Sequence, residues 1–212
     1  MNPLSDRLEI HQAFSAAFRG GGSWHGPGAE AQMVDAWSGS ASAADRAVLA
    51  HCTGPTLDIG CGPGRMAEIL AAQGQVVLGI DVVPEAVFQT RERGAAALLR
   101  DVFDQIPAEG RWETALLADG NIGIGGDPIT LLRRVRETLN GEGRAVVDLA
   151  KCGIGIEIGS VRVETAGRVS EPFPWAVVGV DMAGFVAAEA GFEPPSIHQY
   201  GDRWFGVMQV AA

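Results

Sequence analysis

Five aspartates are the residues of this chain whose type and spacing could do chemistry. Asp58, Asp81, Asp101, Asp119 and Asp148 each end, or follow closely, a short and mostly apolar run. If those runs are parallel strands, their carboxyl ends meet at one edge of a sheet, where open α/β sheets bind ligands. Carboxylates gathered at one edge repel one another. We therefore expect them to serve a ligand that offers a cation, hydroxyl groups or amine hydrogens.

A glycine-rich segment joins the first of these aspartates to a helical pattern over 65–72. The segment is Leu57-Asp58-Ile59-Gly60-Cys61-Gly62-Pro63-Gly64, with three glycines on alternate positions. Glycine lets a backbone turn sharply and lets a ligand approach closely, because it has no Cβ. The free N–H groups that begin the helix would face whatever lies on the loop. A strand, a glycine loop and a helix in this order are typical of nucleotide-binding α/β domains.

The glycine spacing separates two kinds of cofactor. A dinucleotide fingerprint needs Gly-x-Gly-x-x-Gly, whereas the third glycine here comes one place early, at Gly64, and Arg65 stands where that fingerprint has glycine. The segment instead resembles motif I of the class I S-adenosylmethionine-dependent methyltransferases, whose loop passes under the methionine part of the cofactor. The resemblance covers about residues 55–150 well and the ends only as topology. The amino-acid sequence of residues 119–127 is also similar to that of uncharacterised actinobacterial members of this family.

The resemblance implies a role for each strand end. Asp81 resembles the motif II acid that accepts both ribose hydroxyls, although it could instead cap a helix over 84–93. Asp101 and the two residues after it resemble motif III, which binds and flanks the adenine. Asp58 and Gly60 resemble the positions that hold the methionine end, and residues 118–119 those that hold its ammonium. The residues expected at the cofactor are Asp58, Gly60, Cys61, Gly62, Gly64, Arg65, Asp81, Val82, Asp101, Val102, Phe103, Ala118 and Asp119.

The acceptor side carries fewer signals. Trp24 and His25 lie in a glycine-rich segment over 19–28 that we expect to be a loop, and His25 is a candidate general base. Asn121 and Ile122 follow the fourth strand, where this family places methyl transfer. N-terminal segments of the family commonly cover the cofactor, so we expect the segments 19–28 and 120–126 to face each other across the methyl group. The alternative places the N-terminal helices outside and the acceptor at a hairpin around 154–175.

Alternation of strand and helix patterns predicts the fold. Apolar runs at 56–59, 76–80, 97–99, 114–117 and 144–149 are interspersed with helical patterns at 65–72, 84–93 and 128–139. This predicts a Rossmann-like, doubly wound α/β sheet that is mostly parallel, with helices on both faces. Runs at 197–200 and 204–210 predict a C-terminal antiparallel hairpin, and 154–169 an extra one. Helical patterns at 5–18, 31–37 and 43–51 predict an N-terminal helical cap.

We expect one methyltransferase domain over 1–212. It would comprise a helical cap (1–53), a cofactor-binding core (54–150) and a C-terminal half with a substrate hairpin (151–212).

Composition limits the partners. The chain has 212 residues, 47 % of them hydrophobic, and a formal net charge of −10. Lys151 is its only lysine, so there is no basic stripe for nucleic acid. Without a signal-peptide pattern or a membrane-spanning run, we expect a cytoplasmic protein, either monomer or homodimer. Its three scattered cysteines predict no metal site, and Cys61 is better explained as a small loop residue than as a nucleophile.

These features predict methyl transfer from S-adenosylmethionine, with S-adenosylhomocysteine as product, to an O, N, S or C atom of a small molecule. Three alternatives stay open. One is an enzyme of the same fold and cofactor that transfers no methyl, such as a cyclase or lyase. The others are a regulatory protein that binds the cofactor and a nicotinamide-dependent oxidoreductase, which Arg65 disfavours.

Overall fold

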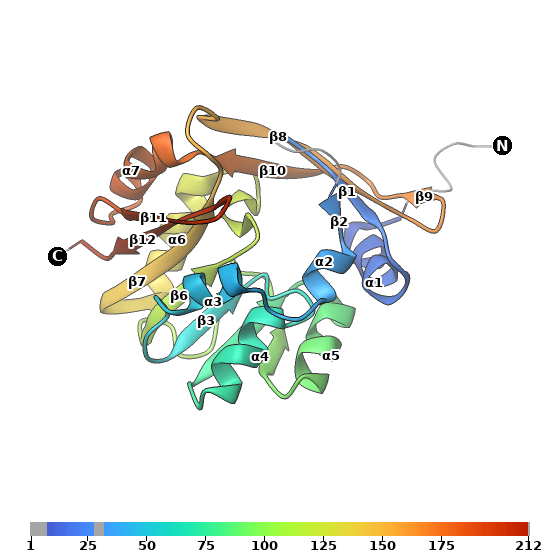
Figure 1. The fold of residues 1–212 in the computed structure, drawn as a ribbon, viewed down its shortest axis with the longest axis horizontal. Coiled ribbons are helices and arrows are strands. Elements are labelled where there is room, and N and C mark those ends of the chain that lie inside the picture. The colour runs from blue at the N-terminus through green and yellow to red at the C-terminus, as the bar shows by residue number, and fades with distance from the viewer. Residues whose placement is uncertain (1–7, 28–31, 212) are drawn as a thin grey trace.

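A seven-stranded sheet lies at the centre of the computed structural model, which describes residues 8–27 and 32–211 (Figure 1). In spatial order its strands are β11 (Ser196–Tyr200), β12 (Arg203–Gln209), β7 (Leu139–Leu149), β6 (Trp112–Leu117), β3 (Thr56–Ile59), β4 (Val77–Asp81) and β5 (Ala96–Leu99). The strands from β7 to β5 pair in parallel, and β12 pairs antiparallel with both β7 and β11. This confirms the predicted mostly parallel sheet with a C-terminal antiparallel hairpin.

Helices cover both faces of this sheet. The helices α3 (Ala43–Leu49) and α4 (Arg65–Ala72) share one apolar core with Leu116 and Val146. The helices α6 (Pro128–Thr138) and α7 (Val180–Glu189) share another with Leu117 and Val147. Neighbouring residues of one strand point to opposite faces, so continuous apolar runs are needed to fill both cores. A further helix, α5 (Pro84–Glu92), packs against β4 and β5.

A second, antiparallel sheet crosses the top of the view in Figure 1. Its main strands are β10 (Phe173–Val178), β8 (Ile156–Thr165), β1 (Ser23–His25) and β2 (Gln32–Met33), in that order, and β9 (Arg168–Val169) also pairs with β8. The pairing of β8 with β9 confirms the extra hairpin predicted over 154–169. The helix α1 (Ile10–Gly20) packs on β8.

The N-terminal segment differs from the prediction. The loop expected over 19–28 contains β1, and the helix expected over 31–37 gives β2 and the short α2 (Asp35–Ser38). Residues 5–7 of the helix expected over 5–18 lie outside the described residues, and α1 extends to Gly20.

The reason lies in two glycines that flank β1. A Cβ on Gly22 would lie 2.7 Å from the Glu164 carbonyl oxygen, and one on Gly26 would lie 2.0 Å from a Val161 methyl. These glycines therefore permit close packing on β8, so a glycine-rich composition that predicts a loop here accommodates a paired strand.

Two predicted helix starts are confirmed. Ser42 caps α3, forming reciprocal side-chain and backbone hydrogen bonds with Asp45, and Asp127 caps α6 through the amides of residues 129 and 130. Within the described ranges, no helix has the length and apolar composition that a membrane span requires.

Candidate cofactor and acceptor site

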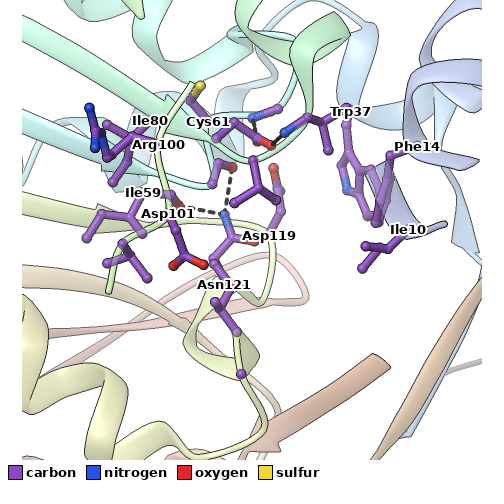
Figure 2. Close-up of a pocket in the computed structure, with 18 of the residues that line it drawn as sticks. Ile10, Phe14, Trp37, Ile59, Cys61, Ile80, Arg100, Asp101, Asp119 and Asn121 are labelled. Atoms are coloured by element: carbon purple, nitrogen blue, oxygen red, sulfur yellow. Dashed lines mark hydrogen bonds between the residues drawn. The ribbon is translucent and has the colours of Figure 1, made fainter. Parts of the chain in front are cut away.

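A cavity of about 300 Å³ lies beyond the carboxyl ends of β3, β4 and β6. Figure 2 shows Ile10, Phe14 and Trp37 on the side of this cavity opposite Ile80 and Arg100. Of the residues expected at the cofactor, those that line it are Gly60, Cys61, Gly62, Arg65, Asp81, Val82, Asp101, Val102, Phe103 and Asp119. Asp58, Gly64 and Ala118 are not part of its lining.

The glycine loop needs its glycines for two different reasons. Gly60, Gly62 and Gly64 all have positive φ angles, of 68°, 52° and 87°. A Cβ on Gly64, the N-cap of α4, would lie 2.6 Å from the Thr90 hydroxyl oxygen, whereas one on Gly62 would meet nothing within 4 Å. Gly64 therefore serves the packing of α4 against α5, and Gly62 leaves open space on the cavity side.

Asn121 holds the glycine loop from the neighbouring strand. Its side-chain amide donates hydrogen bonds to the carbonyl oxygens of Ile59 and Gly60, each over 2.9 Å, as the dashed lines in Figure 2 indicate. Asn121 lines the cavity, but these hydrogens are engaged by the loop. Ile122, the other expected substrate residue in this segment, is buried and lines a second cavity.

Asp81 is fixed between the glycine loop and the turn into α5. Its Oδ2 accepts the Gly62 amide over 2.9 Å, and its Oδ1 accepts the Val83 amide over 2.9 Å. Val83 is the N-cap of α5, so Asp81 ties two loops together rather than capping the helix. Burial raises the pKa of Asp81 to about 6, against the opposing effect of these amides. An ionised carboxylate can accept about four hydrogen bonds, so two acceptor positions are left for neighbouring hydroxyl groups.

Asp58 is a buried carboxylate with one oxygen unpaired. It is 1 % exposed, and its Oδ2 has no hydrogen-bond partner among the described residues. Burial, followed by the charges of Asp119 and Asp81, raises its pKa to about 7, although Arg65 opposes the shift. A cation bound at the cavity would favour the ionised form and offset this cost.

Asp101 and its neighbours form the adjoining part of the wall. Asp101 is exposed and its Oδ1 accepts the Phe103 amide over 3.0 Å. Phe103 and Val82 are both partly exposed, and Val102 is buried. This arrangement places apolar side chains beside a carboxylate, which suits a flat, polar-edged ring.

Arg65 lines the cavity and also belongs to a network of ion pairs. It pairs with Asp45 of α3 and, over 2.6 Å, with Asp119. Arg203 of β12 pairs with the same Asp45 and with Asp148, and lies 3.4 Å from Asp119. Burial would raise the pKa of Asp45, but hydrogen bonds from Arg65 and Ser42 and the Arg65 charge lower it to about 2. The network joins α3, α4, β7 and the hairpin at the edge of the site.

Asp119 sits at the centre of this network. It has a positive φ of 52°, which is uncommon for a residue other than glycine. Its amide donates to the Asp148 carboxylate over 2.5 Å, and its own carboxylate faces Arg65 and Arg203. These contacts hold the backbone turn that leads into residues 120–126.

Six aromatic side chains, which we call the aromatic wall, close the cavity opposite the glycine loop. They are Phe14, Phe18, Trp24, Trp37, Phe173 and Trp175. Trp24 packs edge-on against Trp175 with ring centroids 4.7 Å apart, and against Trp37 at 5.7 Å. Ile124 of the segment 120–126 forms a backbone bridge with Trp175. The structure thus brings Trp24 and the segment 120–126 to the same cavity.

His25 points away from this cavity. Successive side chains of a strand point to opposite faces, so Trp24 is buried while the side chain of His25 is 48 % exposed. His25 contacts the Ser23 hydroxyl over 2.9 Å and Glu164 at 3.8 Å, and it lines neither described cavity. The geometry therefore gives no support to His25 as a general base.

Cys61 lines the cavity but does not have the environment of a nucleophile. Its Sγ lies 3.6 Å from the Thr90 hydroxyl, and burial raises the pKa of its thiol well above the ordinary value. The interpretation of Cys61 as a small loop residue agrees with this position.

Several residues at the site were missed by the sequence analysis. Asp45 and Arg203 give no local signal, because their partners are distant in sequence. Phe14, Trp37, Phe173 and Trp175 look like ordinary apolar residues of helices and strands. The tryptophans were the available signal, since four of the five line one or both cavities.

Comparison with known proteins agrees with this geometry. The model of a methyltransferase domain family matches residues 56–143. A ubiquinone biosynthesis O-methyltransferase from Glaesserella parasuis is 38 % identical over 53 residues, which span 25 % of this chain and 22 % of that protein. The chain therefore matches less than a quarter of the length of that curated relative.

Solved structures show the same fold over almost the whole chain. A SAM-dependent methyltransferase from Bacteroides fragilis, in complex with S-adenosyl-L-homocysteine, superposes with a TM-score of 0.80 at 20 % identity, covering 98 % of this chain and 96 % of that one. A 1,6-didemethyltoxoflavin-N1-methyltransferase from Burkholderia thailandensis gives a TM-score of 0.61 at 17 % identity, covering 84 % and 82 %. Residues 56–143 thus match a methyltransferase domain family, and the chain shares its fold with solved S-adenosylmethionine-dependent methyltransferases.

Proposed function

We propose that this protein transfers the methyl group of S-adenosylmethionine to a small molecule. The observation that carries the proposal is the pair formed by Asp81 and Gly62 at the mouth of the glycine loop. It presents a fixed carboxylate with two free acceptor positions, which a ribose diol would fill. Buried Asp58 has one carboxylate oxygen without a hydrogen-bond partner among the described residues. A sulfonium or ammonium group nearby would stabilise the ionised form of this carboxylate.

The remaining cofactor contacts follow from the cavity wall. Asp101 would accept the adenine amine, and Val82, Val102 and Phe103 would flank the ring. Gly60 and Gly62 would let the loop backbone approach the methionine part, with Cys61 between them as a small residue. Residues 118–119 would lie near the ammonium, with Asp119 held by the two arginines.

The protein's contribution to the reaction would be placement and exclusion of water. When bound, S-adenosylmethionine supplies a methyl group on a cationic sulfur, which an acceptor lone pair attacks as the carbon–sulfur bond breaks and its electrons return to sulfur. The aromatic wall would shield this point from solvent, and the loop held by Asn121 would fix the cofactor side. Among the described residues, neither cavity lining contains a histidine, so a proton lost by the acceptor would pass to solvent or to a carboxylate of the linings.

Size and charge favour a small acceptor. The cavities of about 300 and 430 Å³ are in the range of small-molecule sites, and the net charge of −10 opposes nucleic acid. In this proposal residues 1–212 act as one unit, in which 54–150 bind the cofactor while 1–53 and 151–212 enclose the acceptor.

Ligand-induced stabilisation tests the cofactor. S-adenosylhomocysteine should raise the melting temperature, as any ligand of the native state does, whereas NAD and NADP should not. If NAD alone raises the melting temperature, the result would favour an oxidoreductase instead. Incubation with methyl-labelled S-adenosylmethionine and a metabolite extract should then give a labelled product by mass spectrometry. Cofactor binding without any labelled product would favour the regulatory or non-transferring alternatives.

A further inference from the structure

A second cavity adjoins the cofactor cavity. It measures about 430 Å³ and lies beyond the ends of β6 and β7, next to the turn between β11 and β12. The two cavities share four lining residues, Trp24, Trp37, Asp119 and Trp175. A molecule in the second cavity would therefore meet the cofactor at the part of the wall where Asp119 lies.

Tryptophan dominates the apolar part of this second cavity. Four of the five tryptophans of the chain line it, namely Trp24, Trp37, Trp175 and Trp204. They come from β1, from α2, from β10 and from β12, so four separate elements contribute an indole to one space. Large indole surfaces favour a flat, aromatic occupant over a flexible chain.

Within the described part of the chain, not every charged side chain that lines the second cavity has an ion-pair partner. Asp148 and Asp119 are paired with Arg203, as described above. Lys151, the only lysine of the chain, also lines the cavity and has no carboxylate partner among the described residues. Asp202, exposed at the turn between β11 and β12, is the remaining carboxylate of the lining. Lys151 is thus the cation available to a ligand.

We infer that the methyl acceptor is a small aromatic acid, with its ring against the tryptophans and its carboxylate at the Lys151 ammonium. This inference rests on the proposed methyltransferase function and names the substrate class of the same site. The free charge at Lys151 selects for an anion because an ion pair within hydrogen-bond reach discriminates against a neutral group of the same shape. The acceptor atom would then lie on the ring edge that faces Asp119.

Three matched probes test this inference. The compounds are 3-hydroxybenzoate, 3-hydroxybenzamide and 3-hydroxybenzylamine, which share a ring and differ in charge. Each is titrated by calorimetry into the whole protein saturated with S-adenosylhomocysteine, whose own binding is measured first. We expect the benzoate to bind about tenfold more tightly than the benzamide. The benzylamine should bind most weakly.

Variants separate the role of Lys151 from a general effect of charge. Lys151→Ala should remove the preference for the benzoate, and Lys151→Arg should retain most of it. Arg162→Ala is the matched control, because Arg162 is exposed on β8 and lines neither cavity. Trp204→Leu should weaken all three probes alike.

The outcomes are distinguishable. Three results would each overturn the inference: equal binding of benzoate and benzamide, tightest binding of the benzylamine, or no binding of any probe. Tightest binding of the benzylamine would also assign the selecting charge to Asp202. Loss of S-adenosylhomocysteine binding in the unaltered protein would instead refute the proposed function itself.

Discussion

The Gly62 amide and the Asp81 carboxylate are joined by a 2.9 Å hydrogen bond that links the loop after β3 to the end of β4. The Val83 amide holds the second oxygen of the same carboxylate at 2.9 Å. Both oxygens are therefore oriented before any ligand arrives. A ligand that uses them does not have to order a mobile side chain, and this preorganisation favours affinity.

Asp81→Ala should weaken the binding of S-adenosylhomocysteine by about 10- to 100-fold, or about 1.5–3 kcal/mol, because two hydroxyl groups lose a charged acceptor. Isothermal titration calorimetry measures this directly. Asp104→Ala is the control, since Asp104 is exposed and lies outside both cavities. The unliganded variant should also melt earlier than the control, because two amides lose their partner. If affinity stays unchanged, Asp81 serves only to tie the two loops.

Cofactor binding should release protons at pH about 6.5. Burial holds the pKa of Asp58 at about 7 and that of Asp81 at about 6, so both are partly protonated there. A bound cation lowers such pKa values. Calorimetry with S-adenosylmethionine in phosphate and in imidazole buffers should give binding enthalpies that differ by the heat of the transferred protons. Asp58→Asn should reduce this difference, and buffer-independent enthalpies would contradict the prediction.

Asp58→Asn should also stabilise the unliganded protein more at alkaline pH than at acidic pH. The folded-state pKa of Asp58 is raised from 3.8 to about 7. The native state therefore binds more protons than the unfolded state between these values, and the stability of the unaltered protein falls as pH rises through about 7. The advantage of the variant should grow by on the order of 2–3 kcal/mol between pH about 5 and about 8. Urea unfolding at the two pH values measures it, and a constant difference would refute it.

Arg203→Met should destabilise the protein by about 3–5 kcal/mol, since it leaves Asp148 buried without its partner. Arg133→Met is the matched control, because the Arg133 side chain is 57 % exposed. Adding Asp148→Asn to Arg203→Met should restore part of the loss. Urea denaturation compares the variants. Equal stability of the Arg203 and Arg133 variants would show that the network contributes nothing to folding.

Trp24 and His25 should differ in their effect on methyl transfer, although the sequence analysis placed them together. Trp24→Ala opens the aromatic wall and should lower turnover of the acceptor at least tenfold. His25→Ala should leave turnover within about twofold, since its side chain faces away from both cavities. The labelled-methyl assay measures both, and S-adenosylhomocysteine affinity should be nearly unchanged in each. A large loss in His25→Ala would return His25 to the list of catalytic candidates.

The part of the candidate site around the glycine loop was predictable because its signals are local. The glycine spacing, the strand ends and the acid at Asp81 lie within short windows whose physics does not depend on the rest of the chain. The acceptor half was not, because β1 is defined by its partner β8 and not by its own three residues. The same holds for Asp45 and Arg203, whose pairing across 158 positions leaves no trace in either segment.

Pairing of β1 with β8 costs more chain entropy to form than the strand pairings of the parallel core do. The Thr165 hydroxyl donates to the Gly21 carbonyl across 144 positions of the chain, so this junction closes a far longer loop than any pair of neighbouring strands in the parallel core. We expect amide hydrogen exchange to be faster in β1 than in β3 or β6. The antiparallel sheet beside the cavities would then open and reclose while the parallel core stays folded, and such opening would admit a ligand to a space that the sheet otherwise covers.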